Sequence, residues 1–426
     1  MFTRNWAAAA YVLVALATSF SQAADWPQWR GPNRDGISKE AGLLHQWPAE
    51  GPNLIWQLTD IGSGYSTPSI AAGRIFLLGN QGMDDEFVQA RNEKDGVLIW
   101  STHIGKVGNP DQQPPYPGAR STPTIDGQAL YALGSDGDLA CLQLSDGSMR
   151  WHKNLRSDFG GEPGVWAYSE SPLIDGDTLV CTPGGKDATI VALNKKTGET
   201  IWKAALPDAD QAAYASAIVT TIDGVKQYVQ FVQKAVVGLD AKTGALLWSY
   251  GRTAKGSPAN IPTPLADGKY IYTSTGMTGG GLVKIDKTAD AEPKFDASQV
   301  YFAGNLPKAI GGVVKVDGYF YGANTQALQC VDFNTGDVKW TDRSIGPGSI
   351  LYADGQLYLH GENGDVALVD AEPDAYHEKG RFTPPDAPDR SAAGLSMKAW
   401  AYPVLANGRL YVRDQNHLWC YDLKAK

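Results

Sequence analysis

Charged residues are scarce in this sequence: Lys, Arg, Asp and Glu make up 19% of 426 residues, and the formal net charge is -9. No cluster of Lys and Arg is longer than a pair. The chain therefore lacks the basic face that binds phosphate, and nucleic acid is not expected as a partner. The composition, with 48 Gly, 25 Pro and 43% hydrophobic residues, also excludes a disordered tail protein, a coiled coil and a helical bundle.

Cysteine and histidine are also few, with four and six residues. The cysteines are far apart, so there is no adjacent pair and no Cys-x-x-Cys-His motif for haem attachment. The histidines form no close pair with zinc spacing, and acidic turns such as Asp84-Asp85-Glu86 lack the spaced ligands of a calcium loop. These motifs predict no metal and no cofactor.

The longest apolar run, residues 7–20, is shorter than the roughly 20 residues that a spanning helix needs. It follows Arg4 and precedes the small residues around Ala23, which is typical of a secretory signal peptide over residues 1–23. An uncleaved membrane anchor is the alternative. Since the first cysteine is Cys141, no lipid-modified cysteine follows the cleavage site. We expect a mature chain without a membrane span that is periplasmic or secreted.

One pattern recurs through the rest of the chain: two β-rich runs joined by a polar turn, then Thr-Gly or Asp-Gly, then Trp. The tryptophans in this last position are 44 to 51 residues apart, except for one gap of 92 residues: Trp56, Trp100, Trp151, Trp202, Trp248 and Trp340. The gap is twice 46, so one repeat lacks its Trp, and the sequence offers Phe295 in its place. A tryptophan here would fill the wedge between neighbouring units.

A second position, six residues before the turn glycine, is usually small and occurs eight times: Ala90, Cys141, Ala192, Gly238, Lys284, Cys330, Leu368 and Cys420. Three cysteines in this position are predicted to be buried thiols, with a Cys141–Cys181 bridge between adjacent units as the alternative. Each unit has four short runs with strand pattern, for example within residues 121–154. Eight four-stranded units predict a single all-β, eight-bladed β-propeller.

The two ends of the repeat array complement each other. The last unit stops at Lys426 without a fourth strand, whereas residues 53–59 are a fourth strand without a unit before them. We expect this N-terminal strand to complete the last blade and close the ring, which leaves no open first or last edge. The predicted organisation is a signal peptide (1–23), an N-terminal arm (24–52) and the propeller (53–426).

The repeats VALNKKTGETIW (191–202) and VGLDAKTGALLW (237–248) resemble those of pyrroloquinoline quinone (PQQ)-like β-propeller proteins over essentially the whole mature chain. The opening DWPQWRGPNRDGIS (25–38) and the stretch from Ala167 to Leu193 look most like secreted PQQ-like propellers of planctomycetes. A more distant similarity is to the propeller scaffold of the outer-membrane β-barrel assembly machine (BamB). The resemblance implies a quinoprotein-dehydrogenase-like fold, and it does not choose among activities.

Long loops gather on one face of the expected propeller, because strands alternate in direction. Residues 103–120, 152–168, 276–281 and 381–400 all lie on that side, where binding residues concentrate. Counting back from the proline that opens each innermost strand places Ser169 and Ile261 at the channel mouth, together with the predicted ligand-binding residues Tyr65, Arg120, Trp166, Tyr168, Glu170, Tyr214, Trp400 and Tyr402. Alternatively, the aromatics plug the funnel and Arg120 pairs with Glu170.

Three functions remain open. The first is a non-catalytic, monomeric binding or scaffold module, with an envelope or extracellular protein or glycan on the long-loop face. The second is a PQQ-dependent oxidoreductase using calcium, for which the resemblance would require adjacent cysteines and a Glu, Asn and Asp set that are not recognisable here. The third is a propeller enzyme acting on polysaccharide, with Arg120, Tyr168 and Glu170 for binding and proton transfer. The first is preferred.

Overall fold

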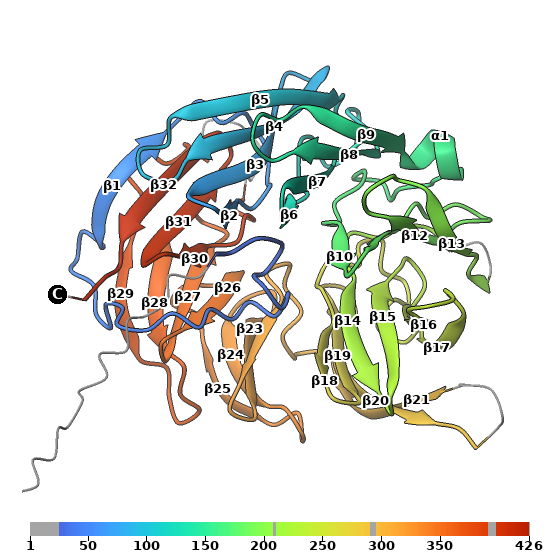
Figure 1. Ribbon diagram of the computed structural model, residues 1–426. Coiled ribbons are helices and arrows are strands. Elements are labelled where there is room, and N and C mark those ends of the chain that lie inside the picture. Colours follow the sequence, from blue (N-terminus) through green and yellow to red (C-terminus); the bar gives the residue numbers. More distant parts are fainter. Residues whose placement is uncertain (1–24, 208–209, 290–294, 391–397, 426) are drawn as a thin grey trace, which may run out of the picture.

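The computed structural model describes residues 25–207, 210–289, 295–390 and 398–425. The predicted signal peptide, residues 1–23, lies outside them. The described residues form eight four-stranded antiparallel sheets arranged as blades around a ring, and one short helix. The fold is the predicted all-β, eight-bladed propeller (Figure 1).

In the first four blades, given from the innermost strand outward, the strands are β2 (Ser69–Ala71), β3 (Arg74–Gln81), β4 (Asp85–Asn92) and β5 (Leu98–Gly105); β6 (Thr124–Asp126), β7 (Ala129–Leu133), β8 (Asp138–Gln143) and β9 (Met149–Asn154); β10 (Leu173–Asp175), β11 (Thr178–Cys181), β12 (Ile190–Asn194) and β13 (Thr200–Ala204); and β14 (Ile218–Ile222), β15 (Val225–Phe231), β16 (Val236–Asp240) and β17 (Leu246–Tyr250). The helix α1 (Leu155–Phe159) follows β9.

In the last four blades, the strands are β18 (Leu265–Asp267), β19 (Tyr270–Thr275), β20 (Gly279–Lys287) and β21 (Phe295–Ala303); β22 (Val313–Val316), β23 (Tyr319–Ala323), β24 (Leu328–Asp332) and β25 (Val338–Asp342); β26 (Gly348–Ala353), β27 (Gln356–Gly361), β28 (Val366–Asp370) and β29 (Glu378–Phe382); and β30 (Val404–Ala406), β31 (Arg409–Asp414), β32 (His417–Asp422) and β1 (Asn53–Leu58).

The N-terminal strand closes the ring as predicted. β1 pairs antiparallel with β32, and Trp56 lies opposite Cys420. The eighth blade therefore contains three strands from the C-terminal end and one from the N-terminal end of the propeller sequence, and Figure 1 shows the blue and red strands side by side. The ring is therefore closed by backbone hydrogen bonds within the eighth blade, and the chain runs from β1 of this blade directly into the first blade.

The recurring tryptophans link neighbouring blades. Each lies on the outermost strand opposite the small residue of the third strand, as in the Cys141–Trp151 pair. In most of them the indole nitrogen donates to a carbonyl in the next blade, for example from Trp100 to Leu144 at 3.2 Å and from Trp151 to Lys195 at 2.9 Å. Trp248 instead donates to Gln227 Oε1 of its own blade at 2.7 Å. The small residue makes room for the indole ring, and the hydrogen bond satisfies its polar edge.

In the fifth blade the predicted substitute, Phe295, is wrong. The residue opposite Lys284 is Ser298, and Phe295 pairs with Lys287 at the far end of the strand. Tyr301 takes the tryptophan's role instead, because its hydroxyl donates to the Phe333 carbonyl of the next blade at 2.9 Å. Its ring lies against Gly336, the turn glycine of the next blade, just as tryptophans of other blades lie against the turn glycine of the blade that follows.

The seventh blade has no tryptophan on its outer strand, since Gly380 lies opposite Leu368. Trp47, from the arm before β1, covers this position. Its backbone nitrogen donates to the Lys379 carbonyl at 2.9 Å, and its ring lies 6.0 Å from that of Tyr358. The arm therefore supplies the aromatic ring that the repeat itself lacks.

The start of the arm crosses the centre of the ring (Figure 1). It contacts the inner strands or the segments leading into them in six blades, through these backbone and side-chain pairs: Trp26 with Ile70, Pro27 with Ile125, Arg34 with Ser171, Trp29 with Thr263, Arg30 with Val313, and Gly36 with Tyr352. The start of the arm therefore lies within the ring of innermost strands.

All four cysteines are buried free thiols. Cys141 and Cys181 lie in one hydrophobic cluster without a bond between them, and burial raises the pKa of Cys141 to about 11. The prediction of core thiols agrees with this arrangement, and the alternative bridge is not formed. Within the described part of the chain, no helix has the length and hydropathy needed to cross a bilayer.

Candidate functional site

A cavity of about 290 Å³ opens at the starts of the innermost strands, on the long-loop side. We call it the cup. It is lined by Trp29, Tyr65, Tyr116, Arg120, Trp166, Ser169, Tyr214, Ser216, Ala259, Ile261, Ile310, Trp400 and Tyr402. Six of the eight predicted ligand-binding residues are in this set, as are Ser169 and Ile261, so the structure brings most of the predicted channel mouth together.

Tyr168 and Glu170 do not line the cup, which corrects their predicted placement. Both flank Ser169, and successive side chains in an extended segment point to opposite sides. Ser169 faces the cavity and its two neighbours face the core between blades. Tyr168 is 2% exposed, and its hydroxyl donates to the Pro183 carbonyl at 2.8 Å.

Glu170 is held in a buried hydrogen-bond network. Its carboxylate accepts from the Thr182 backbone nitrogen, from Thr182 Oγ1 at 2.8 Å and from Gln230 Nε2 at 2.9 Å. Burial raises the pKa of Glu170 to about 7, against the lowering effect of these hydrogen bonds and of Arg34. The alternative prediction of an Arg120–Glu170 pair is therefore also wrong, because the carboxylate faces other partners.

Arg120 is the charged residue of the cup. Its guanidinium donates to the Trp166 carbonyl at 2.6 Å, to Gln112 Oε1 at 3.1 Å and to the Tyr116 carbonyl, and it lies 5.8 Å from the centre of the Tyr65 ring. Burial lowers the pKa of Arg120, while Tyr65 and Glu86 raise it. Its bonds join the two long loops that precede the innermost strands of the second and third blades.

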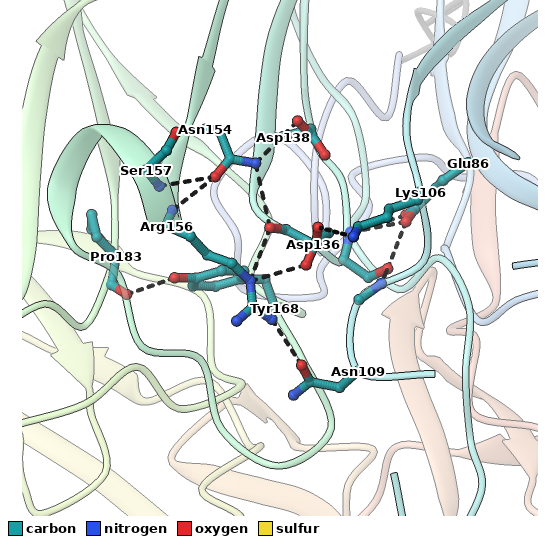
Figure 2. A network of polar contacts seen from close by, with 12 residues as sticks. Glu86, Lys106, Asn109, Asp136, Asp138, Asn154, Arg156, Ser157, Tyr168 and Pro183 are labelled. Carbon is teal, nitrogen blue, oxygen red and sulfur yellow. Dashed lines mark hydrogen bonds and ion pairs between the residues drawn. The ribbon is translucent and has the colours of Figure 1, made fainter. Parts of the chain in front are cut away.

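Glu86 lies behind these loops at the junction of the first two blades (Figure 2). It is fully buried and accepts from Ser135 N at 3.0 Å and from Ser135 Oγ at 2.5 Å. Burial raises the pKa of Glu86 to about 7, although Ser135 and Arg120 both favour the ionised form. The site thus contains a carboxyl group that titrates near neutral pH and acts on Arg120 through space.

A second set of polar contacts fixes the loop that carries Trp166 (Figure 2). The helix α1 begins after Asn154, whose side chain accepts from Arg156 N at 3.0 Å and Ser157 N at 3.1 Å, as an N-cap does. Arg156 pairs with Asp136 at 3.0 Å and donates to Asn109 Oδ1 at 2.8 Å. Asn109 in turn donates to the loop carbonyls of residues 164 and 165. The walls of the cup are therefore braced from outside.

The aromatic rings of the cup contact one another at edge and tilted angles. Trp400 lies 5.3 Å from Tyr65 and 4.8 Å from Tyr116 between ring centres. On the other wall, Trp166 lies 5.8 Å from Tyr214. Trp29 and Tyr402 form a further pair at 4.5 Å. These contacts leave ring faces and edges toward the cavity rather than a single flat stack.

Five lining residues were not predicted from the sequence: Trp29, Tyr116, Ser216, Ala259 and Ile310. Trp29 comes from the arm that crosses the channel, and Tyr116 comes from the interior of a long loop. Neither follows from counting back along an innermost strand. The aromatic-rich opening at residues 25–38 was a signal for Trp29, since an arm with two tryptophans and two arginines needs a place to bury them.

The described lining of the cup has no carboxylate or imidazole group for proton transfer or for binding a cation. Among the described residues that line it, none is Asp, Glu, His or Cys. Calcium takes six to eight oxygen ligands, including carboxylates, and the lining offers none, so the residues present do not fit a calcium-bound quinone. General acid–base catalysis needs a titratable group within hydrogen-bond reach of the reacting atoms. Within the described residues, the lining contains no carboxyl or imidazole group for this role.

A carboxylate and imidazole cluster occurs elsewhere, after β28. Asp370, Glu372 and His377 bring their ligand atoms within 4.8 Å of one another. The Asp370 carboxylate already receives Lys379 Nζ at 3.0 Å and Gln356 Nε2 at 2.8 Å. These partners satisfy the carboxylate without a metal ion, so the cluster is explained by hydrogen bonds and ion pairs on the surface of the seventh blade.

The chain is similar to known proteins in sequence and in structure. Residues 36–185 and 164–342 match the family described as outer membrane protein assembly factor BamB. Among curated relatives, BamB of Shewanella oneidensis is 24% identical over 225 residues, covering 51% of this chain and 50% of that protein. The quinoprotein alcohol dehydrogenase PedH of Pseudomonas putida is 25% identical over 286 residues, covering 66% of this chain and 42% of that protein. The chain thus spans half or less of the length of these relatives.

Solved structures show the same architecture. BamB from Moraxella catarrhalis superposes with a TM-score of 0.60 at 15% identity, covering 87% of this chain and 98% of that one. A quinohemoprotein alcohol dehydrogenase from Pseudomonas putida superposes with a TM-score of 0.54 at 13% identity, covering 95% of this chain and 81% of that one. At such identities the superpositions support the fold alone.

Proposed function

This chain belongs to the family described as outer membrane protein assembly factor BamB, and from that premise we propose that it is a non-catalytic binding or scaffold module of the bacterial envelope. In this proposal the mature protein is a periplasmic or secreted monomer. Its long-loop face receives an envelope or extracellular protein or glycan. The signal-peptide pattern of residues 1–23 and the names of its relatives support this location.

The observation that carries the proposal is the composition of the cup. Seven aromatic side chains and one arginine line a concave site, with no carboxylate or imidazole among its described residues. Aromatic walls with few polar groups are typical of recognition sites. The rigid network around Arg120 and Arg156 holds these walls in place before a ligand arrives, which favours binding over a reaction that needs moving acid and base groups.

The similarity to quinoprotein alcohol dehydrogenases supports a PQQ-dependent oxidoreductase as the second candidate. The donor set of the cup is the argument against it, because no lining carboxylate is present to share calcium with the quinone. An enzyme acting on polysaccharide is less well supported still, since Tyr168 and Glu170, its proposed proton-transfer residues, face the core.

Two measurements on the purified mature chain test the proposal. The first is dye-linked alcohol oxidation after incubation with PQQ and calcium, where we expect no activity above a blank. The second is binding of envelope glycan and protein fractions to the immobilised chain. We expect saturable binding that Arg120→Gln reduces at least tenfold. Arg150→Gln is the matched control, because Arg150 lies exposed on β9 and bonds only to Gln143 and the Gln128 carbonyl. Dye reduction dependent on PQQ would overturn the proposal.

A further inference from the structure

The charge of the cup is positive and unbalanced by its own lining. Arginine has five N–H donors, and three contacts from Arg120 to chain oxygens account for three of them. None of these oxygens belongs to a carboxylate. The nearest interacting carboxyl groups, such as Glu86, lie behind the wall and are bonded to Ser135. A ligand with one negative charge therefore meets a cation with spare donors and no lining anion to repel it.

The cup also contains hydroxyl groups that a purely apolar ligand would leave unmet. Ser169 Oγ is buried and has no hydrogen-bond partner among the described residues. Ser216 Oγ accepts from Ser171 N at 2.9 Å, and no described group receives its own proton. Both serines line the cavity. Since buried polar groups are nearly always hydrogen-bonded, a ligand that bears several hydroxyls fits this site better than a flat aromatic acid.

The size of the cavity and the chemistry of its lining restrict the class of ligand further. A volume of about 290 Å³ is large enough to admit a sugar ring. Aromatic side chains, including Trp400 and Tyr65, line the cavity, and such rings supply the apolar surface against which the C–H groups of a sugar can pack. The opening lies on the long-loop face, so the rest of a glycan chain can extend into solvent.

From these observations we infer that the cup binds a single uronic-acid ring at the end of an acidic glycan. Arg120 binds the carboxylate, Ser169 and Ser216 bind ring hydroxyls, and the aromatic residues pack against the ring. This inference rests on the proposed binding function and names its ligand. It assigns no bond making or breaking to the site, and the lining has no carboxylate or imidazole group among its described residues.

The test compares sodium D-glucuronate with two probes: D-glucose, which has a neutral hydroxymethyl group in place of the carboxylate, and sodium benzoate, which has a carboxylate on an aromatic ring without hydroxyls. Binding is followed by the fluorescence of the tryptophans of the cup and by calorimetry. We expect glucuronate to bind at least tenfold tighter than either other probe. If glucose binds as tightly as glucuronate, Arg120 does not recognise the carboxylate. If benzoate binds as tightly, the site does not recognise a sugar ring. Either result overturns the inference.

Variants separate recognition from folding. Arg120→Gln is expected to abolish the preference for glucuronate over glucose, and Arg150→Gln to preserve it. Because Arg120 also holds the loops, Ser169→Ala serves as a second variant. It should weaken glucuronate about threefold and leave benzoate unchanged. If no probe binds while the envelope fraction still binds in an Arg120-dependent manner, the inference fails and the proposed function stands. If neither binds, both fail.

Discussion

Trp47 lies directly over Gly380, and the two residues come from segments more than 330 positions apart in the sequence. A β-carbon added to Gly380 would approach the Trp47 β-carbon to 2.5 Å. The glycine thus leaves the space that Trp47 fills against Tyr358 and Phe382, at ring distances of 6.0 and 5.5 Å. The seventh blade depends on the arm for an aromatic ring that the other seven blades carry on their own outer strand, as a tryptophan in six of them and as Tyr301 in the fifth.

Replacing Trp47 with alanine should destabilise the whole propeller. Trp47 is 4% exposed, and removing a buried large aromatic side chain costs about 3–5 kcal/mol. The free energy of unfolding, measured in urea, is expected to fall by that amount. Trp166→Ala is the comparison, because Trp166 lines the open cup and should cost clearly less. Equal losses for the two variants would show that Trp47 is not a special link between the arm and the seventh blade.

Removing β1 should open the ring. A chain that begins at residue 60 loses the hydrogen bonds between β1 and β32 and loses Trp56, which faces Cys420. It also loses the arm with Trp47, so a second chain that carries only Trp47→Ala separates the contribution of the arm. Without β1 the β32 edge of the last blade is unpaired. We expect this chain to aggregate or to unfold at a markedly lower temperature than a chain that begins at residue 25. Thermal unfolding with light scattering measures both effects. Matching transitions would contradict closure by β1 as a source of stability.

Stability should fall as the pH rises toward neutrality. Burial raises the pKa of Glu86 and of Glu170 from 4.5 to about 7, so between these values the folded chain holds protons that the unfolded chain has released. Where the folded state binds more protons, the free energy of unfolding decreases with pH. The contribution of these two groups is present below about pH 4.5 and is lost as the pH passes about 7.

Urea unfolding at pH 5 and pH 8 measures this dependence. The double variant Glu86→Gln, Glu170→Gln keeps the shape of both side chains and cannot ionise there, so it should flatten the difference between the two pH values. Charged groups that act on these carboxyls include Arg120 and Asp138 for Glu86, and Arg34 for Glu170. An unchanged slope in the double variant would show that other groups set the pH dependence.

Glu170 and Arg120 should respond oppositely to mutation. Glu170→Ala leaves the buried N–H and hydroxyl of Thr182 without their acceptor, and each unsatisfied buried group costs about 1–3 kcal/mol. Gln230, in contrast, keeps the Ala215 carbonyl. We expect a clear loss of stability and little change in ligand binding at the cup. Arg120→Gln should reduce binding and change the unfolding temperature less. If Glu170→Ala abolishes binding in a fully stable protein, the placement of Glu170 away from the site is wrong.

Most of the fold could be predicted from the repeat pattern of the sequence. Blade number, strand order and ring closure followed from residues that recur because each blade must pack against the next, such as Trp151 opposite Cys141. The predictions failed in the blades where residues outside the repeat pattern complete the packing. In the fifth blade, Tyr301 reaches the Phe333 carbonyl from a different position than a tryptophan does. Trp47 belongs to an arm that has no counterpart in the other blades.

The candidate site was predictable where it follows strand geometry. Counting back from the prolines found Tyr65, Arg120 and Tyr214 because the innermost strands start alike. The method failed at Tyr168 and Glu170, where it ignored that neighbours of Ser169 point the other way. It could not find Trp29 or Tyr116, because the paths of the arm and of long loops are set by tertiary contacts rather than by local pattern.

The pairing of β1 with β32 determines when the eighth blade can be completed during synthesis. A ribosome makes the N-terminal strand first, yet the strand has no partner until the final residues of the propeller have been made. Throughout synthesis the growing chain therefore carries an unpaired strand near its N-terminal end and an incomplete blade at its C-terminal end, and both strand edges stay open to other chains until they pair.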